Sequence, residues 1–170
     1  MSISQTRERS DLLSTLAKHR GFLLQTVRGL TDEEAAKRTT VSELCLAGLV
    51  KHVAQAEENW VRFIEHGPSA MGEMSAAAFE AHAASFRMEP GQTLAGLLER
   101  YADVERRTEE VVAAVPDLDS EQPLPPRPWF EPGARWSVRR VLLHLLAETA
   151  QHAGHADIIR EALDGAKTMG

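Results

Sequence analysis

The sequence predicts an all-α four-helix bundle with a long proline-rich loop before its last helix. Three observations predict this fold class. Apolar residues recur at helical spacing in four long segments, capping residues and Gly or Pro stops bracket those segments, and none of the segments between them shows convincing strand alternation. With no internal repeat and no visible domain boundary, residues 1–170 are expected to form a single domain.

The first half of the chain predicts two long helices joined by a short one. The first is expected over residues 4–28 or so, where leucines fall at helical spacing until Gly29. Thr31-Asp32-Glu33-Glu34 matches a capping box and should begin one or two short helical turns. The second long helix is expected from about Leu44 to His66, where Gly67-Pro68 should stop it.

The middle of the chain predicts a short helix and then a third long one. Residues Met71 to Phe86 are rich in alanine and favour a short helix, and Glu89-Pro90-Gly91 is typical of a turn. The third long helix is expected from about Thr93 to Val115.

The last third predicts a loop followed by the last long helix. Residues 116–136 contain most of the chain's eight prolines, so a helix is excluded there and a long ordered loop is expected. Loops of this length are often functional, although a plain connector fits the sequence equally well. Ser137 should cap the last helix, which is expected over residues 138–163 or so and should end at Gly165.

Composition excludes several classes of partner. The formal net charge is -6 and no basic cluster is visible, so we expect no nucleic-acid partner. Cys45 is the only cysteine, which indicates a reducing compartment. We see no signal peptide and no apolar stretch of membrane-spanning length, so we expect no membrane partner and a cytoplasmic protein.

The last helix carries a chemically unusual pair on its inner face. At about 100° per residue, His152 projects near the middle of the helix's apolar arc and Glu148 projects at the edge of that arc. A carboxylate near a core is costly unless it is paired or binds a metal. Residues four apart on a helix lie one above the other, so these two side chains are able to hold one ion.

A third ligand is expected from the second long helix, where His52 lies at the edge of the apolar arc. Three protein ligands leave an open position, as in catalytic metal sites, so we predict a divalent metal bound by His52, Glu148 and His152. The alternatives are that Glu148 pairs with an arginine such as Arg139 or Arg140 and that His152 is a packed core histidine.

The remaining histidines are less distinctive. His144 and His155 are interpreted as residues behind the ligands or at the rim of the site, although either is able to replace a predicted ligand. His19, His66 and His82 are interpreted as surface or rim residues. The expected mouth of the site holds four more residues, each of which fits packing or surface roles as well: Trp60, Trp129, Trp136 and Arg135.

Three segments resemble a known family. Leu46 to Glu57, followed by Trp60, resembles the second helix of the DinB/YfiT-like superfamily, and Gly29 to Glu33 fits its first inter-helix turn. Trp136 to Glu161 is similar to the last helix of the branch that includes the mycothiol-dependent maleylpyruvate isomerases and many small uncharacterised proteins.

The resemblance implies a four-helix bundle with a three-ligand divalent metal site. Most superfamily members use three histidines, whereas Glu148 replaces one of them here, as in the maleylpyruvate isomerase branch. Those isomerases carry a second, C-terminal domain that contributes to their active site. Because this chain ends at Gly170, their isomerase activity is not transferred. Zinc is the first expectation for the metal, with nickel, manganese or iron as alternatives.

The function expected from site and resemblance is a metal-dependent thiol S-transferase, or a thiol-dependent isomerase-like enzyme. Because Cys45 lies at or just before the start of the second helix, the nucleophile is expected to be an exogenous low-molecular-weight thiol, with mycothiol favoured over bacillithiol. The electrophile and the catalytic residues are not assigned. The alternatives are a metal-dependent hydrolase and a non-enzymatic, metal-stabilised binding or stress-response module.

The resemblance also implies a homodimer. Slight support comes from the third long helix, which has more apolar residues than one core stripe needs: Leu94, Leu97, Leu98, Tyr101, Val104, Val111 and Val112.

Overall fold

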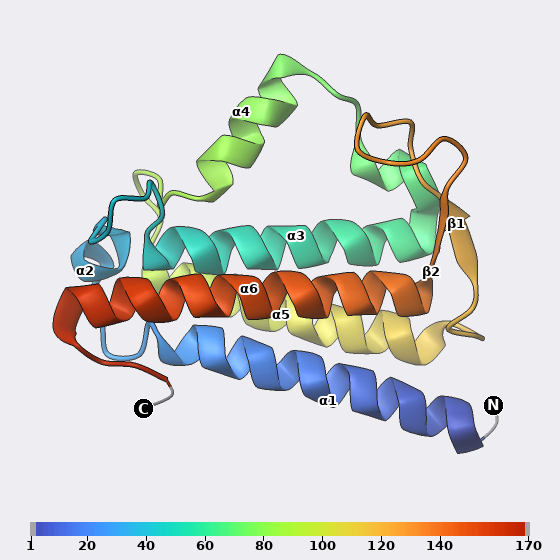
Figure 1. Ribbon diagram of the computed structural model, residues 1–170, viewed down its shortest axis with the longest axis horizontal. Helices are drawn as coiled ribbons and strands as arrows, with labels where there is room; N and C mark the ends of the chain where they lie inside the picture. The colour runs from blue at the N-terminus through green and yellow to red at the C-terminus, as the bar shows by residue number, and fades with distance from the viewer. Residues whose placement is uncertain (1–2, 169–170) are drawn as a thin grey trace.

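The computed structural model describes residues 3–168, and its side chains from Thr6 onward. It is a bundle whose α1 packs against α6, while α3 packs against both α5 and α6 (Figure 1). The predicted all-α four-helix bundle is therefore confirmed. Within the described residues, no helix combines the length and apolarity needed to cross a membrane. The long helices are α1 (Ile3–Gln25), α3 (Leu46–His66), α5 (Leu94–Ala114) and α6 (Val138–Asp164).

Local sequence signals fix the helix ends close to where they are predicted. The short helix α2 (Asp32–Ala36) begins with the predicted capping box, in which Thr31 and Glu34 bond to each other's backbone amides. Ser137 caps α6 through the amide of Arg140. Gly165 ends α6 with a φ of 80°, a left-handed conformation that glycine adopts at little cost.

The apolar faces of the long helices meet in two clusters of buried residues along the bundle. By the sequence pattern alone, seven apolar residues of α5 are more than one core stripe needs. Six of them are buried in the core of this single chain, and the seventh, Leu98, packs against that core. The apolar stripe of α5 therefore gives the predicted homodimer no separate support.

The segment between α3 and α5 departs from the bundle. Gly67 ends α3 as predicted, but a 3-10 turn, η1 (Gly67–Met71), follows directly. The predicted short helix is α4 (Ala76–Ser85), which begins later than expected and whose N-terminal end stands away from α3 (Figure 1). Its C-terminal end lies so close to Gly48 that a Cβ there would be 1.9 Å from the Phe86 carbonyl oxygen. A glycine at this position therefore permits α4 to dock on α3.

The prediction of no strand is wrong within the proline-rich loop. Strands β1 (Glu121–Pro123) and β2 (Arg135–Ser137) form an antiparallel pair that closes the base of the loop. The Leu124 amide continues the pairing by donating to the Ala134 carbonyl at 2.9 Å. Strands of three residues are too short to show an alternating pattern, and a proline in one of them argues against a strand.

Candidate metal centre

The three predicted ligands lie together between α3 and α6. His52 comes from α3, while Glu148 and His152 come from successive turns of α6. Glu148 Oε1 is 3.4 Å from His52 Nε2 and 3.3 Å from His152 Nε2. One ligand atom from each residue lies within 4.8 Å of the other two, which is close enough for all three to hold one metal ion.

The electrostatics of this cluster favour a cation. Hydrogen bonding, to which His152 contributes most, holds the pKa of Glu148 well below its usual range, so its carboxylate is ionised at neutral pH. Burial lowers the pKa of His52, whose ring is therefore neutral under the same conditions. A carboxylate oxygen beside imidazole nitrogens is a donor set that suits zinc and related divalent metals.

The alternative partners of Glu148 are engaged elsewhere. Arg139 pairs with Glu8 and Asp119, and Arg140 stacks on the ring of Trp136 with its guanidinium carbon 4.4 Å from the ring centre. Within residues 3–168, Glu148 has no arginine or lysine partner. The interpretation of Glu148 as half of a structural ion pair therefore finds no support.

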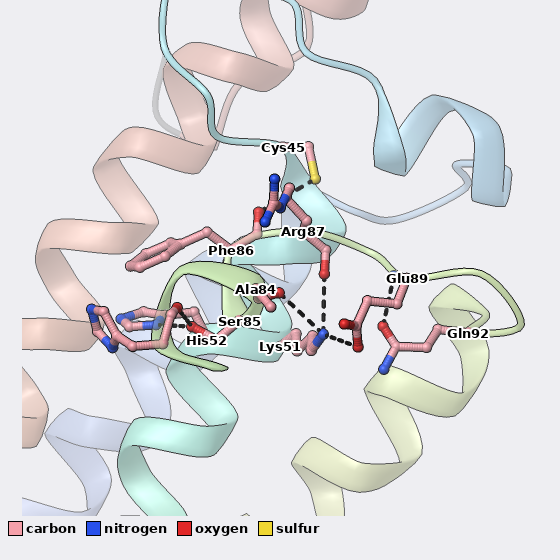
Figure 2. A network of polar contacts seen from close by, with 10 residues as sticks. Cys45, Lys51, His52, Ala84, Ser85, Phe86, Arg87, Glu89 and Gln92 are labelled. Atoms are coloured by element: carbon pink, nitrogen blue, oxygen red, sulfur yellow. Dashed lines mark hydrogen bonds and ion pairs between the residues drawn. The ribbon is translucent and has the colours of Figure 1, made fainter. Parts of the chain in front are cut away.

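The C-terminal end of α4 holds His52 from two sides. Nδ1 of His52 lies 2.9 Å from the hydroxyl of Ser85, and the His52 ring stacks on Phe86 with ring centres 3.8 Å apart (Figure 2). Sequence reasoning missed both residues. They sit at the end of an alanine-rich segment in which nothing distinguishes them, and only the docking of α4 brings them to the site.

The other histidines take different positions around the cluster. His155 lies behind His152, with their Nδ1 atoms 3.5 Å apart. His144 packs edge-on against Trp60 and Trp136, and burial lowers its pKa. Neither belongs to the group of atoms close enough to share an ion among the described residues. Both positions agree with the prediction that these histidines lie behind the ligands or at the rim.

A pocket of about 700 Å³ opens beside His52 and Glu148. On the α3 side it is lined by Gln55 and Asn59, which follow His52 at helical spacing and share its face. A projection of α3 could have found both. His82 is exposed as predicted, yet it also lines this pocket.

The opposite wall of the pocket is mainly apolar and comes from α4, η1 and the proline-rich loop. Arg127 ties the loop to the end of η1 by donating to the Gly72 carbonyl at 2.7 Å. Of the four residues expected at the mouth, Trp60 and Trp129 line the pocket. Trp136 stacks behind Trp60 and Arg135 pairs with Glu121, so neither belongs to its lining.

The single cysteine does not face this pocket. Cys45 is the N-cap of α3 and is 3% exposed. Its Sγ lies 3.4 Å from the amide of Gly48 and 3.8 Å from the carbonyl of Phe86. A thiol nucleophile in the pocket would therefore have to come from solution.

Comparison with known proteins gives one family and one fold. The family model described as mycothiol-S-transferase matches residues 11–165. No curated protein sequence matches the chain. A solved structure of a conserved protein from Enterococcus faecalis superposes with a TM-score of 0.63 over 98% of this chain and 99% of that one. At 14% identity this likeness shows the fold alone.

Proposed function

This chain belongs to the mycothiol-S-transferase family, and from that premise we propose that it is an enzyme that transfers a low-molecular-weight thiol to an electrophile. His52, Glu148 and His152 would hold a divalent metal, with zinc as the first candidate and nickel, manganese or iron as alternatives. The convergence of these three side chains, two of which line a pocket, is the observation that carries the proposal.

The pocket supports an enzyme over a structural metal site. A structural zinc site is closed by four protein ligands, whereas a catalytic site has three and an open position. The cluster here offers three, and His52 and Glu148 both line the pocket. About 700 Å³ falls within the usual range for small-molecule sites.

Different residues around the pocket would bind the thiol and the electrophile. A bound divalent metal would favour the thiolate form of a thiol at neutral pH. Gln55 and Asn59 offer amide groups beside His52, suited to the polar body of a thiol such as mycothiol or bacillithiol. The apolar wall, which includes Phe79 and Trp129, suits the carbon skeleton of an electrophile. Neither aromatic residue is covered, since Phe79 is 55% and Trp129 is 61% exposed.

A hydrolase is the second candidate, because the open side that admits a thiol also admits water. The two readings differ in what must enter the pocket. A hydrolase needs only its substrate, whereas a transferase depends on a second small molecule that carries a thiol.

The direct test begins with metal analysis of the purified protein. The cobalt form is then titrated with mycothiol and with bacillithiol, because a sulfur ligand changes the visible spectrum of cobalt. We expect that change together with thiol-dependent consumption of an alkylating electrophile. A metal-loaded protein that hydrolyses esters or amides without thiol would favour the hydrolase. Metal binding without either activity would favour a binding module.

A matched pair of variants separates the site from the helix that carries it. His52→Ala removes a proposed ligand near the start of α3, and His66→Ala removes an exposed histidine at the end of the same helix. We expect His52→Ala to lose metal and transferase activity while His66→Ala keeps both. Equal metal content in the two variants would contradict the proposed ligand set.

The predicted homodimer stays a proposal. Light scattering over a concentration series tests it, and a monomer mass throughout would contradict it.

A further inference from the structure

The hydroxyl of Ser85 lies between a proposed metal ligand and a backbone carbonyl. Ser85 is 3% exposed and occupies the last position of α4. Its Oγ is 2.6 Å from the carbonyl oxygen of His82 and 2.9 Å from Nδ1 of His52. Carbonyls in the last turn of a helix lack amide partners further along the chain, which explains why that of His82 takes the hydroxyl.

Counting hydrogens fixes the direction of both bonds. A serine hydroxyl has one hydrogen to donate, and a carbonyl oxygen only accepts, so the hydrogen of Ser85 goes to His82. Toward His52 the Ser85 oxygen is then an acceptor, and Nδ1 of His52 must donate. A neutral imidazole has one N–H, so Nε2 of His52 carries a lone pair. That lone pair lies on the side of Glu148, whose Oε1 is 3.4 Å away.

We propose that Ser85 is the positioning residue that selects the Nδ1–H tautomer of His52 and directs the free Nε2 lone pair into the metal centre. The proposal rests on the ligand set given under the proposed function and adds the residue that prepares one of those ligands. An imidazole that donates its other N–H to an oxygen is the arrangement by which proteins orient histidine ligands.

The position of Ser85 is itself fixed by α3. Lys51, the neighbour of His52, donates to the carbonyls of Ala84 and Arg87, each at 3.2 Å, and pairs with Glu89 at 2.9 Å (Figure 2). Its ammonium group thus holds the residues on either side of Ser85 and Phe86. The close approach at Gly48 brings the same backbone against α3.

Phe86 restrains His52 in a second direction. The two rings stack at an interplanar angle of 22°, so rotation of the imidazole out of its plane would break this contact. The hydroxyl of Ser85 therefore sets which edge of the ring is protonated, and the stacking sets its plane. Earlier residues of α4, including Phe79 and His82, line the pocket, so one short helix forms a wall of the pocket and also prepares a ligand.

The first test reads the tautomer directly and needs neither metal nor substrate. Long-range proton–nitrogen NMR of the metal-free protein at about pH 8, above the ordinary histidine pKa, distinguishes protonated from free ring nitrogens. We expect His52 to show a protonated Nδ1 and a free Nε2. A protonated Nε2 in the wild-type protein would overturn the proposal, whatever the enzyme proves to do.

The second test measures metal affinity by competition with a chromophoric chelator. Ser85→Ala removes the acceptor, and we expect affinity to fall by about 10–100-fold, as for other partners of metal-bound histidines. Ser85→Thr keeps the hydroxyl and should restore most of the affinity. Ser75→Ala is the matched control, because Ser75 caps the other end of α4 and does not contact His52.

The outcomes separate this proposal from the proposed function. Wild-type affinity in Ser85→Ala would overturn the positioning role while leaving the metal site intact. A loss in Ser85→Thr or Ser75→Ala as large as in Ser85→Ala would assign the effect to packing of α4 and also overturn it. A catalytically inactive protein with the expected tautomer and the expected affinity series would sustain the positioning role and reject only the transferase.

Discussion

Two carboxylates on the inner faces of the bundle, Glu57 on α3 and Glu148 on α6, have opposite settings. Glu57 is 1% exposed and pairs with Arg20, whose Nε lies 3.0 Å from Glu57 Oε2. Thr108 donates to its other oxygen. Glu148 is 28% exposed, borders a pocket and faces the imidazoles of two histidines.

The difference shows how to distinguish a structural carboxylate from a functional one. A guanidinium carries a permanent charge and a fork of donors, so Arg20 neutralises the charge of Glu57 and donates hydrogen bonds to both of its oxygens within the protein itself. An imidazole carries no permanent charge, so the histidines around Glu148 give its negative charge no fixed cation. A carboxylate in this setting favours the binding of a cation from solution, and the pocket gives that cation access to it.

The largest loss of stability is expected at Glu57, whose charge is paired within the protein. Glu57→Gln leaves the guanidinium of Arg20, 2% exposed, without its main counter-charge, and breaking such a pair costs about 3–5 kcal/mol. Denaturant unfolding measures this loss. Glu58→Gln is the neighbouring control, because Glu58 pairs with Arg100 on the surface and such pairs contribute about 0–1 kcal/mol. Similar losses in the two variants would contradict the contrast between them.

A smaller cost is expected at the metal centre. His152→Ala removes one ligand and leaves Glu148 with fewer partners, so we expect loss of metal and a cost of about 1–3 kcal/mol in the free energy of unfolding. Metal analysis and denaturant unfolding check the two parts separately. His66→Ala is the control, since that side chain is exposed and outside the cluster. Metal retained at wild-type affinity in His152→Ala would remove this residue from the ligand set.

Acid should gradually destabilise the metal-free protein through the titratable groups at and around the metal centre. Burial lowers the pKa values of His52 and His144, so the unfolded chain binds protons more readily than the folded one below the ordinary histidine pKa of about 6.5. Stability should therefore be full above that pH and fall as pH drops below it. The lowered pKa of Glu148 adds a second loss below the ordinary glutamate pKa of about 4.3.

Thermal unfolding between about pH 8 and pH 2 records both stages, because the loss at Glu148 begins near the ordinary glutamate pKa and grows below it. His52→Asn should reduce the loss of stability that begins near the ordinary histidine pKa and leave the loss that begins near the ordinary glutamate pKa. A melting temperature that rises between about pH 7 and pH 5 would contradict the sign of the histidine shifts, and one that rises below about pH 4 would contradict that of Glu148.

The parts of this site that sequence predicts are those that helical periodicity controls. The angular positions of Glu148 and His152 follow from the register of a long helix, and His52 follows from that of α3, so their convergence needs only that the two helices be neighbours. The predicted membership of the DinB/YfiT-like superfamily, confirmed by the family match and the fold, supplies that adjacency.

The parts that sequence does not predict depend on contacts between distant segments. Ser85 reaches His52 because Gly48 and Lys51 bind the end of α4, and no local pattern in an alanine-rich stretch encodes that docking. The partner of Glu57 is likewise set by packing, since Arg20 comes from another helix 37 residues away. Such pairings need the arrangement of the helices before they can be identified.

The smallest effect on stability, and the sharpest test of the comparison, is expected from Glu148→Gln in the metal-free protein. An amide of the same shape removes the negative charge, which stabilises the folded chain as the lowered pKa of Glu148 indicates, but it still offers an N–H to the imidazole nitrogens at 3.3 and 3.4 Å, so the free energy of unfolding should fall by only about 1 kcal/mol. With metal the two proteins should separate. The wild type should gain about 2.7 kcal/mol when free metal is at 100 times its dissociation constant, whereas Glu148→Gln should gain little at the same concentration. The same chemical change at Glu57 should give the reverse pattern, a large loss of stability with the metal affinity of the folded protein preserved. If Glu148→Gln instead destabilised the metal-free protein as much as Glu57→Gln, both carboxylates would be structural, and the case for a functional metal at Glu148 would fail.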